Sequence, residues 1–209
     1  DAILVIWGGD ILDLKGKKIG FGITGSFCTF DRVLPQIKKL INKGAIVQPI
    51  LSYIVAANDT RFMTRDHLME QLLKITGRQP ITTIVDAEPI GPKKLFDLVI
   101  VAPCTGNTLA KLANGITDTP VLMACKSLLR NSRPVLLAVS TNDALGNNAK
   151  NIGVLINTKN IFLVPFTQDS PSTKQNSMVA NMEKIAESAE AALEGRQIQP
   201  VIDVPSNFG

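Results

Sequence analysis

The sequence predicts an α/β fold, in which a parallel sheet is covered by helices on both faces. Short apolar runs that suit buried strands alternate along the chain with segments of helical periodicity. This alternation is typical of right-handed βαβ crossovers, which place successive strands parallel to one another in one sheet. With 209 residues, no internal repeat and no low-complexity linker, the chain is expected to form a single domain.

Five apolar runs are the expected strands of this sheet. They lack the polar alternation of half-exposed strands, as expected for strands that are buried on both faces. They cover residues 19–23, 45–51, 98–102, 135–139 and 161–164, and a further short strand is expected at 81–85. The run at 98–102 is the clearest of them.

Helices are expected between these strands. An apolar stripe with Val33, Ile37 and Leu40 predicts a helix that Gly44 ends, with Pro35 in its first turn. Further helices are expected over residues 65–76, 109–112 and 121–129, with a polar loop over 52–64. The closing helix is predicted from a stripe formed by Met178, Met182, Ile185, Ala189 and Leu193.

Composition and charge argue against several classes of function. The net charge of +4 suits an anionic ligand but is too small to argue for nucleic acid by itself. No window approaches 18 unbroken apolar residues, so no transmembrane helix is indicated. With a single His and no C-x-x-C pattern, no metal site is expected. Three cysteines without paired spacing or a secretory signal favour reduced thiols in the cytoplasm.

The status of the first residues stays open. Residues 1–13 include an apolar run with no basic segment before it and no small-residue cleavage site after it, so the run is a poor signal peptide. We therefore divide the chain into an N-terminal segment of uncertain status, 1–13, and one domain that spans 14–209.

Small polar residues follow three of the predicted strands. Ligands of parallel α/β sheets bind beyond the carboxyl ends of the strands, so these segments are the candidate binding loops. They are Gly22-Ile23-Thr24-Gly25-Ser26, Pro103-Cys104-Thr105-Gly106-Asn107-Thr108 and Ser140-Thr141-Asn142-Asp143. Glycine permits close backbone approach, and hydroxyl and N–H groups donate to phosphate. Together the loops predict a pocket for a phosphorylated planar ligand, although the first alone is equally explained as a tight turn.

Five side chains have alternative interpretations. Arg61 can pair bidentately with a substrate carboxylate, or it can be a solvated loop arginine. Asn142 and Asp143 can orient a substrate or the loop itself. His67 is best explained as a surface or interface residue. Cys104 is better explained as a small buried residue than as a nucleophile. Arg61, Asn142 and Asp143 are the catalytic candidates.

The stretch from Asp97 to Asp118, D-L-V-I-V-A-P-C-T-G-N-T-L-A-K-L-A-N-G-I-T-D, resembles the signature of the flavoprotein family. That family includes phosphopantothenoylcysteine decarboxylase, the peptidyl-cysteine decarboxylases and flavin prenyltransferase. The turn G-I-T-G-S at 22–26 resembles its first loop. The resemblance implies a three-layer α/β/α domain with a Rossmann-like or flavodoxin-like sheet, and flavin mononucleotide (FMN) as cofactor. The residues that it assigns to the cofactor are Gly22, Thr24, Gly25, Ser26, Phe27, Ser52, Pro103, Thr105, Gly106, Asn107, Thr108, Ser140, Thr141 and Asn142.

Several parts of the catalytic relatives have no counterpart in this chain. Residues 83–95 contain no His, although the decarboxylases carry their active-site His there. No Cys follows Cys125, and Phe166 and Thr167 stand where flavin prenyltransferase relatives place a Tyr. Ser140 falls where flavin prenyltransferase uses an arginine against the cofactor phosphate. These absences argue against one alternative function, a self-sufficient FMN-dependent decarboxylase or prenyltransferase. A non-catalytic binding subunit is another alternative.

A narrower resemblance covers about residues 14–202. The runs G-I-T-G-S-F-C-T-F, N-D-T-R-F, R-P-V-L-L-A-V-S-T-N-D-A-L-G and T-K-N-I-F-L-V-P-F-T-Q-D-S-P resemble the family of dipicolinate synthase B subunits. This resemblance implies joint action with an NADP-binding A subunit, which together convert dihydrodipicolinate, a small dicarboxylate, to dipicolinate during sporulation. It also implies the cytoplasm of the mother cell of a spore-forming bacterium. We interpret the loop G-I-T-G-S as distinct from a dinucleotide-binding loop, so we expect the nicotinamide to come from the A subunit. The flavoprotein relatives further imply a homo-oligomer.

Overall fold

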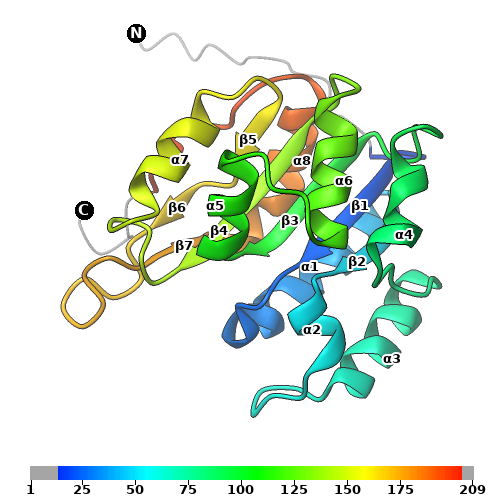
Figure 1. Ribbon diagram of the computed structural model, residues 1–209, viewed down its shortest axis with the longest axis horizontal. Helices are drawn as coiled ribbons and strands as arrows, with labels where there is room; N and C mark the ends of the chain where they lie inside the picture. Colours follow the sequence, from blue (N-terminus) through cyan, green and yellow to red (C-terminus); the bar gives the residue numbers. More distant parts are fainter. Residues whose placement is uncertain (1–13, 204–209) are drawn as a thin grey trace, which may run out of the picture.

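A computed structural model describes residues 14–203, so the interpretation of residues 1–13 lies outside the described part. It confirms the three-layer α/β/α architecture, with one mostly parallel sheet between two layers of helices (Figure 1). The strand order is β2-β1-β3-β4-β7-β6, and β5 pairs with β4. The strands are β1 (Lys18–Ile23), β2 (Ile46–Leu51), β3 (Leu98–Cys104), β4 (Val135–Thr141), β5 (Ile161–Leu163), β6 (Phe166–Thr167) and β7 (Met178–Ala180).

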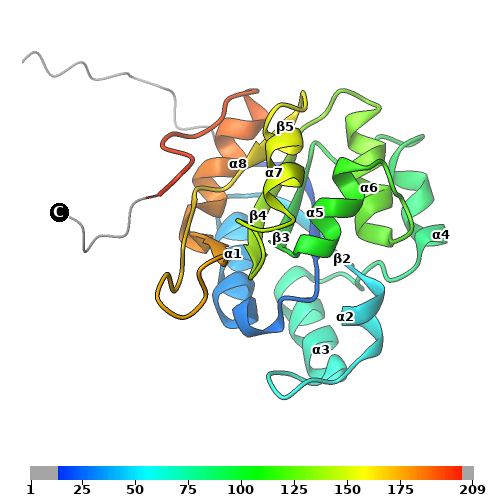
Figure 2. The same ribbon diagram turned by 60° about the vertical axis from the view of Figure 1, so that its left-hand side comes forward.

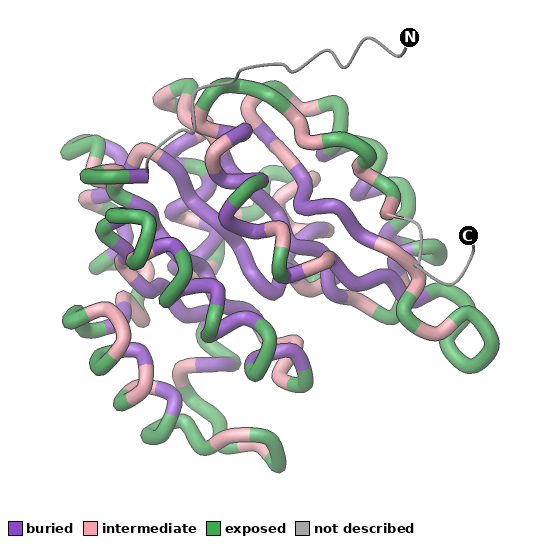
Figure 3. The backbone as a smooth tube through the Cα atoms, turned by 180° about the vertical axis from the view of Figure 1, so that it is seen from behind, coloured by how far each residue is buried: buried purple, intermediate pink, exposed green. Residues whose placement is uncertain are grey.

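The helices form two layers around a continuous apolar core. The helices are α1 (Phe30–Asn42), α2 (Tyr53–Ala57), α3 (Arg65–Thr76), α4 (Ile84–Ala87), α5 (Gly106–Ala113), α6 (Pro120–Leu129), α7 (Ala149–Ile156) and α8 (Ile185–Leu193). Figure 2 shows α1 and α8 on one face of the sheet and α5, α6 and α7 on the other. All seven residues of β3 are buried at the centre, where the tube in Figure 3 is purple. In residues 14–203 no helix is both long and apolar enough to cross a membrane.

One edge of the sheet is antiparallel, whereas the sequence predicted parallel strands throughout. Strands β1 to β5 pair in parallel, but β7 runs antiparallel to β4, with Ser140 opposite Val179. Strand β6 is antiparallel to β7. The predicted closing helix was wrong at its start, because Met178, Val179 and Ala180 are consecutive buried strand residues. A 3₁₀ turn then leads into α8.

Three local predictions were also wrong. At 81–85 only Ile81 bridges to β2, because the Thr83 hydroxyl caps α4 and the backbone turns into that helix. The expected loop at 52–64 begins with α2, which buries Val55. Pro35 lies in the interior of α1, because the helix starts at Phe30 directly after a 3₁₀ turn. Helix α7 and strand β6 had not been predicted.

The close approach of α6 to β1 depends on a missing side chain at Gly22. A Cβ atom there would lie 2.8 Å from Cγ1 of Val121 and 3.4 Å from the carbonyl oxygen of Ile100. Both neighbours are buried, and Ile100 presents backbone that cannot move aside easily. Gly22 is therefore explained by helix–sheet packing, although the resemblance had assigned it to the cofactor.

We predict that Gly22→Ala lowers the free energy of unfolding by about 1–3 kcal/mol, because the added methyl overpacks the contact between α6 and β1. Chemical denaturation measures this change. Gly153→Ala in α7 is the matched control, because a Cβ atom added there would meet no neighbouring heavy atom within 4 Å. That variant should be neutral or more stable by up to about 1 kcal/mol, given the helix propensity of Ala. Equal stability of Gly22→Ala and wild type would contradict the packing argument.

Candidate functional site

An open cavity of about 540 Å³ lies where the predicted loops meet, at the carboxyl ends of β1, β3 and β4. The predicted residues that line it are Gly25, Ser26, Phe27, Arg61, Thr105, Gly106, Ser140, Thr141 and Asn142. The predicted residues outside its lining are Gly22, Thr24, Ser52, Pro103, Asn107, Thr108 and Asp143. The structure thus brings parts of all three loops to one cavity.

Hydrogen bonds between the loops hold the strand ends together. The buried hydroxyl of Thr24 donates to the carbonyl oxygen of Pro103 at 2.6 Å and accepts from the N–H of Thr105 at 3.0 Å. On the other side, the hydroxyls of Ser26 and Ser140 share a hydrogen bond of 2.8 Å. The loop after β1 is therefore tied both to the loop after β3 and to the end of β4.

Helix α5 begins at the cavity. Thr105 is its N-cap, and the Thr105 hydroxyl accepts from the N–H of Thr108 at 3.4 Å. The first N–H groups of a helix have no partner inside the helix, and the helix dipole places partial positive charge there. Because Gly106, the first residue of α5, lines the cavity, this helix end favours an anionic group of a ligand.

A polar network beneath α5 leaves no room for a side chain at Gly106. A Cβ atom there would lie 2.5 Å from Nδ2 of Asn148 and 2.7 Å from both Oδ1 of Asp143 and Oγ1 of Thr141. The Asp143 carboxylate accepts from the Thr141 hydroxyl and, at 2.8 Å, from Nδ2 of Asn148. Of the two roles that the sequence left open for Asp143, these contacts favour orientation of the loop. Asn142 next to it is exposed and lines the cavity.

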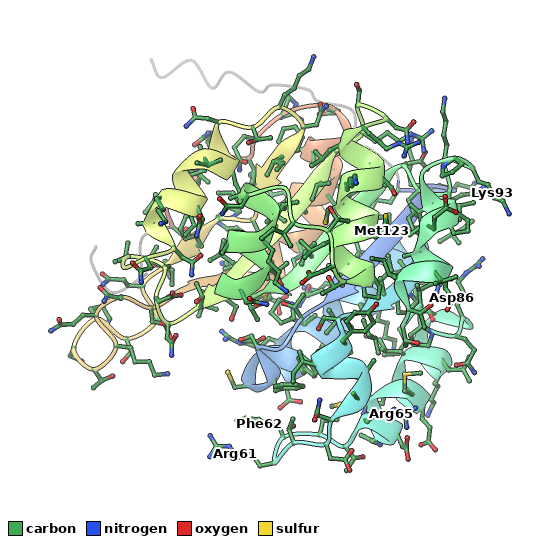
Figure 4. All side chains as sticks on the ribbon, in the orientation of Figure 1. Arg61, Phe62, Arg65, Asp86, Lys93 and Met123 are labelled. Carbon is green, nitrogen blue, oxygen red and sulfur yellow. The ribbon has the colours of Figure 1, made fainter. Side chains whose placement is uncertain are left out.

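Three cations from separate elements line the cavity. Arg32 comes from α1, Arg61 from the loop before α3, and Lys174 from the segment between β6 and β7. Figure 4 shows Arg61 beside Phe62 at the tip of its loop, and the guanidinium carbon lies 4.8 Å from the centroid of the Phe62 ring. Among the described residues, Asp169 is the one carboxylate in this lining. The cavity therefore has a surplus of positive charge.

The sequence had indicated only one of these cations. Arg32 is an exposed charge on a helix, and Lys174 lies in an exposed polar segment, so neither differs from a solvated surface residue in the sequence. The remaining lining residues that were missed are Cys28, Thr29, Phe62, Asp169, Ser177 and Val179. Cys28 and Thr29 directly follow the first predicted loop in the sequence, so their place in the cavity could have been predicted by extending that loop.

Ser52 carries an unsatisfied hydroxyl near the first loop. The residue is buried, its N–H donates to the carbonyl oxygen of Ile23 at 3.0 Å, and its Oγ has no partner among the described residues. It precedes α2 as N-cap, yet its side chain makes no capping hydrogen bond. A buried hydroxyl without a partner costs free energy, and Ser52 does not line the cavity.

The cysteines Cys104 and Cys125 and the histidine His67 do not line this cavity. Burial raises the pKa of the Cys104 thiol well above its ordinary value, and burial also raises the pKa of Cys125 to about 12. Both therefore stay protonated at neutral pH, and neither is an activated nucleophile. His67 lies exposed on α3, where its Nε2 is 2.7 Å from Nε2 of Gln71.

Comparison with known proteins gives consistent matches. The family model described as Flavoprotein matches residues 12–192. The dipicolinate synthase B subunit of Bacillus subtilis is 50% identical over 90% of this chain and 94% of its own length. The crystal structure of the dipicolinate synthase B subunit from Bacillus halodurans is 47% identical, with a TM-score of 0.85 over 92% of this chain and 99% of that one. An FMN-dependent cysteine decarboxylase, 16% identical, with a TM-score of 0.62 over 87% of this chain and 99% of that one, shares the fold.

We predict that one thiol of the native chain reacts with a soluble disulfide reagent at mildly alkaline pH. Cys28 is exposed, whereas burial keeps Cys104 and Cys125 protonated and covered. All three thiols should react after denaturation, and the Cys28→Ser variant should show none in the native state. Rapid reaction of that variant at neutral pH would show that a buried thiol is ionised after all.

Proposed function

The chain belongs to the flavoprotein family, and we propose that it serves there as a B subunit of dipicolinate synthase. The observation that carries the proposal is the cavity, which joins the family's loops to a surplus of cations. The 50% identity to the Bacillus subtilis protein over 90% of the chain supports the same assignment. By the same resemblance, we propose a cytoplasmic location in the mother cell of a spore-former and a homo-oligomeric assembly.

In the proposed reaction, dihydrodipicolinate loses two hydrogens and becomes an aromatic pyridine. One hydrogen leaves as a hydride to NADP⁺, which gives NADPH, and the other leaves as a proton to solvent. We assign the NADP⁺ to a partner A subunit by the family resemblance. The pattern G-x-G-x-x-G does occur at residues 20–25, but Gly20 and Gly22 lie within β1 and pack against Phe96 and Val121, whereas the dinucleotide fingerprint needs its glycines in the turn after the strand. The role of this chain is then to bind and orient the substrate.

The cations of the cavity suit a substrate with two carboxylates. Arg61 can hold one carboxylate bidentately, since a guanidinium presents two parallel N–H donors. Arg32 and Lys174 come from other elements that line the same cavity and can balance the second charge. The exposed amide of Asn142 adds a donor and an acceptor at the end of β4.

The described residues also fit FMN. Several hydrogen-bond donors for the cofactor surround one cavity. They are the N-terminus of α5, the backbone of Gly25 and the hydroxyls of Ser26 and Ser140. Ser140 carries no charge for the cofactor phosphate, but Arg32, Arg61 and Lys174 supply positive charge to the same cavity. When bound, the flavin supplies a two-electron acceptor and donor.

No His lines the cavity, so an FMN-dependent decarboxylase of the usual kind has less support.

We predict that NADPH and dipicolinate form from dihydrodipicolinate and NADP⁺ only when this chain and an A subunit are present together. In that mixture Arg61→Gln should raise KM for dihydrodipicolinate about tenfold or more and change kcat less, since a charge-assisted bond to the substrate is lost. The assay follows the absorbance of NADPH and the amount of dipicolinate.

Arg65→Gln is the matched control. Arg65 is also exposed, but it pairs with Asp66 at 3.1 Å and does not line the cavity. Its kinetic constants should equal those of wild type. Full turnover by this chain alone would contradict the division of labour between the two proteins, and equal effects of the two substitutions would contradict the role of Arg61.

A further inference from the structure

Another cavity, of about 270 Å³, lies at the amino ends of β1 and β2. Lys18, the first residue of β1, lines it, whereas the candidate site follows the last residue of that strand. Strand β1 has six residues, so about 17 Å of strand separates the two cavities. Figure 1 shows the start of β1 next to α4, at the opposite end from the loop that follows the strand.

The floor of this cavity is formed by the amino-terminal residues of β1 and β2. In the parallel register Lys18 lies beside Ile46 and Gly20 beside Gln48, so these residues share one face. Sheets of this class are normally covered by helices on both faces, yet Ile46 is 40% exposed here. Ile46 therefore presents an apolar side chain to this cavity, beside Lys18 and Gln48.

The ring of Phe96 forms one side of the cavity, and its position is fixed by packing. The Phe96 ring packs onto the backbone of Gly20, where a Cβ atom would lie 2.8 Å from Cδ2 of the ring. Phe96 is buried, and Leu95 and Ile81 complete the apolar lining. The atoms of Phe96, Leu95 and Ile81 that line the cavity give an apolar ring a surface to pack against.

Two cations from separate elements border the apolar floor. The side chains of Lys18 and Arg78 make no hydrogen bond or ion pair within residues 14–203. Arg78 follows Gly77, whose left-handed φ of 67° ends α3 and turns the chain back toward the sheet. Within residues 14–203 no carboxylate lines the cavity. The nearby Asp97 accepts from the backbone N–H of Lys18 at 2.9 Å and faces Arg133 at 3.7 Å.

We propose that this cavity is a binding site for a small planar carboxylate, with its ring against Phe96 and Ile46 and its carboxylate between Lys18 and Arg78. The cations and the absence of lining acids select a negative charge, and the apolar wall selects a flat ring over inorganic phosphate. At about 270 Å³ the cavity lies just below the usual size range of ligand pockets, which favours a single-ring ligand over a nucleotide. Its distance from the candidate site allows both to be occupied at once.

Equilibrium binding to the purified chain tests this proposal, with pyridine-2,6-dicarboxylate as the probe and inorganic phosphate for comparison. The choice of this probe rests on the proposed function, because pyridine-2,6-dicarboxylate is the product of the proposed reaction. The measurement is of binding and does not require turnover. Lys18→Gln and Arg78→Gln should each weaken one binding event about tenfold or more, because a charge-assisted contact is lost. Inorganic phosphate should bind this site more weakly than the probe.

Two matched controls separate this site from its surroundings. Lys17→Gln changes the neighbouring, half-buried lysine, which does not line the cavity, and should bind the probe as wild type does. Arg61→Gln should retain the binding event that Arg78→Gln weakens. The proposal is overturned if wild type binds no probe at this site, if the Lys18 and Arg78 variants bind it normally, or if phosphate binds equally well.

The same variants keep this proposal distinct from the proposed function. Arg78→Gln should support normal turnover when it is mixed with an A subunit. The assay is run at low product concentration, so that the second site stays empty. If wild type binds the probe through Lys18 and Arg78 but shows no turnover, the proposed function fails and the second site stands. If turnover occurs and no binding depends on these residues, the second site fails alone.

Discussion

The hydroxyl of Thr24 is the interaction on which the candidate site depends. It donates to the carbonyl of Pro103 and accepts from the N–H of Thr105, so one buried group joins the carboxyl ends of β1 and β3. A buried hydroxyl that both donates and accepts loses little of its hydrogen bonding on leaving water, which is why it is tolerated there. Because Thr105 is also the N-cap of α5, the same bond fixes the direction in which that helix meets the cavity.

A second constraint positions the other side of α5. Gly106 packs onto the side chains of Thr141, Asp143 and Asn148, which hydrogen-bond one another. Of these three, only Thr141 also lines the cavity. The functional surface is thus built from groups on strand ends and one helix end, supported by a polar network beneath. The cations on α1 and on two surface segments then determine what charge the cavity accepts.

The buried strands and their polar ends were predictable, since each is a contiguous pattern. The strands predicted at 19–23, 98–102 and 135–139 appear as β1, β3 and β4, and every residue of β3 is buried. Features that depend on tertiary contacts were not predictable. Met178 and Met182 have helical spacing, yet pairing with β4 makes Met178 a strand residue. Arg32 and Lys174 acquire a role only because the fold brings their elements to one cavity.

The central claim is that three strand ends form one preorganised site for a phosphorylated planar ligand. Titration of FMN with the purified chain, followed by quenching of flavin fluorescence, tests it most directly. Wild type should bind FMN at one site per chain, and Gly106→Ala should bind it about tenfold or more weakly, since the methyl displaces the network beneath α5. Gly146→Ala, whose Cβ would meet an ordinary contact at 3.4 Å, should bind as wild type does. Absence of binding by wild type, or equal binding by Gly106→Ala, would contradict the account.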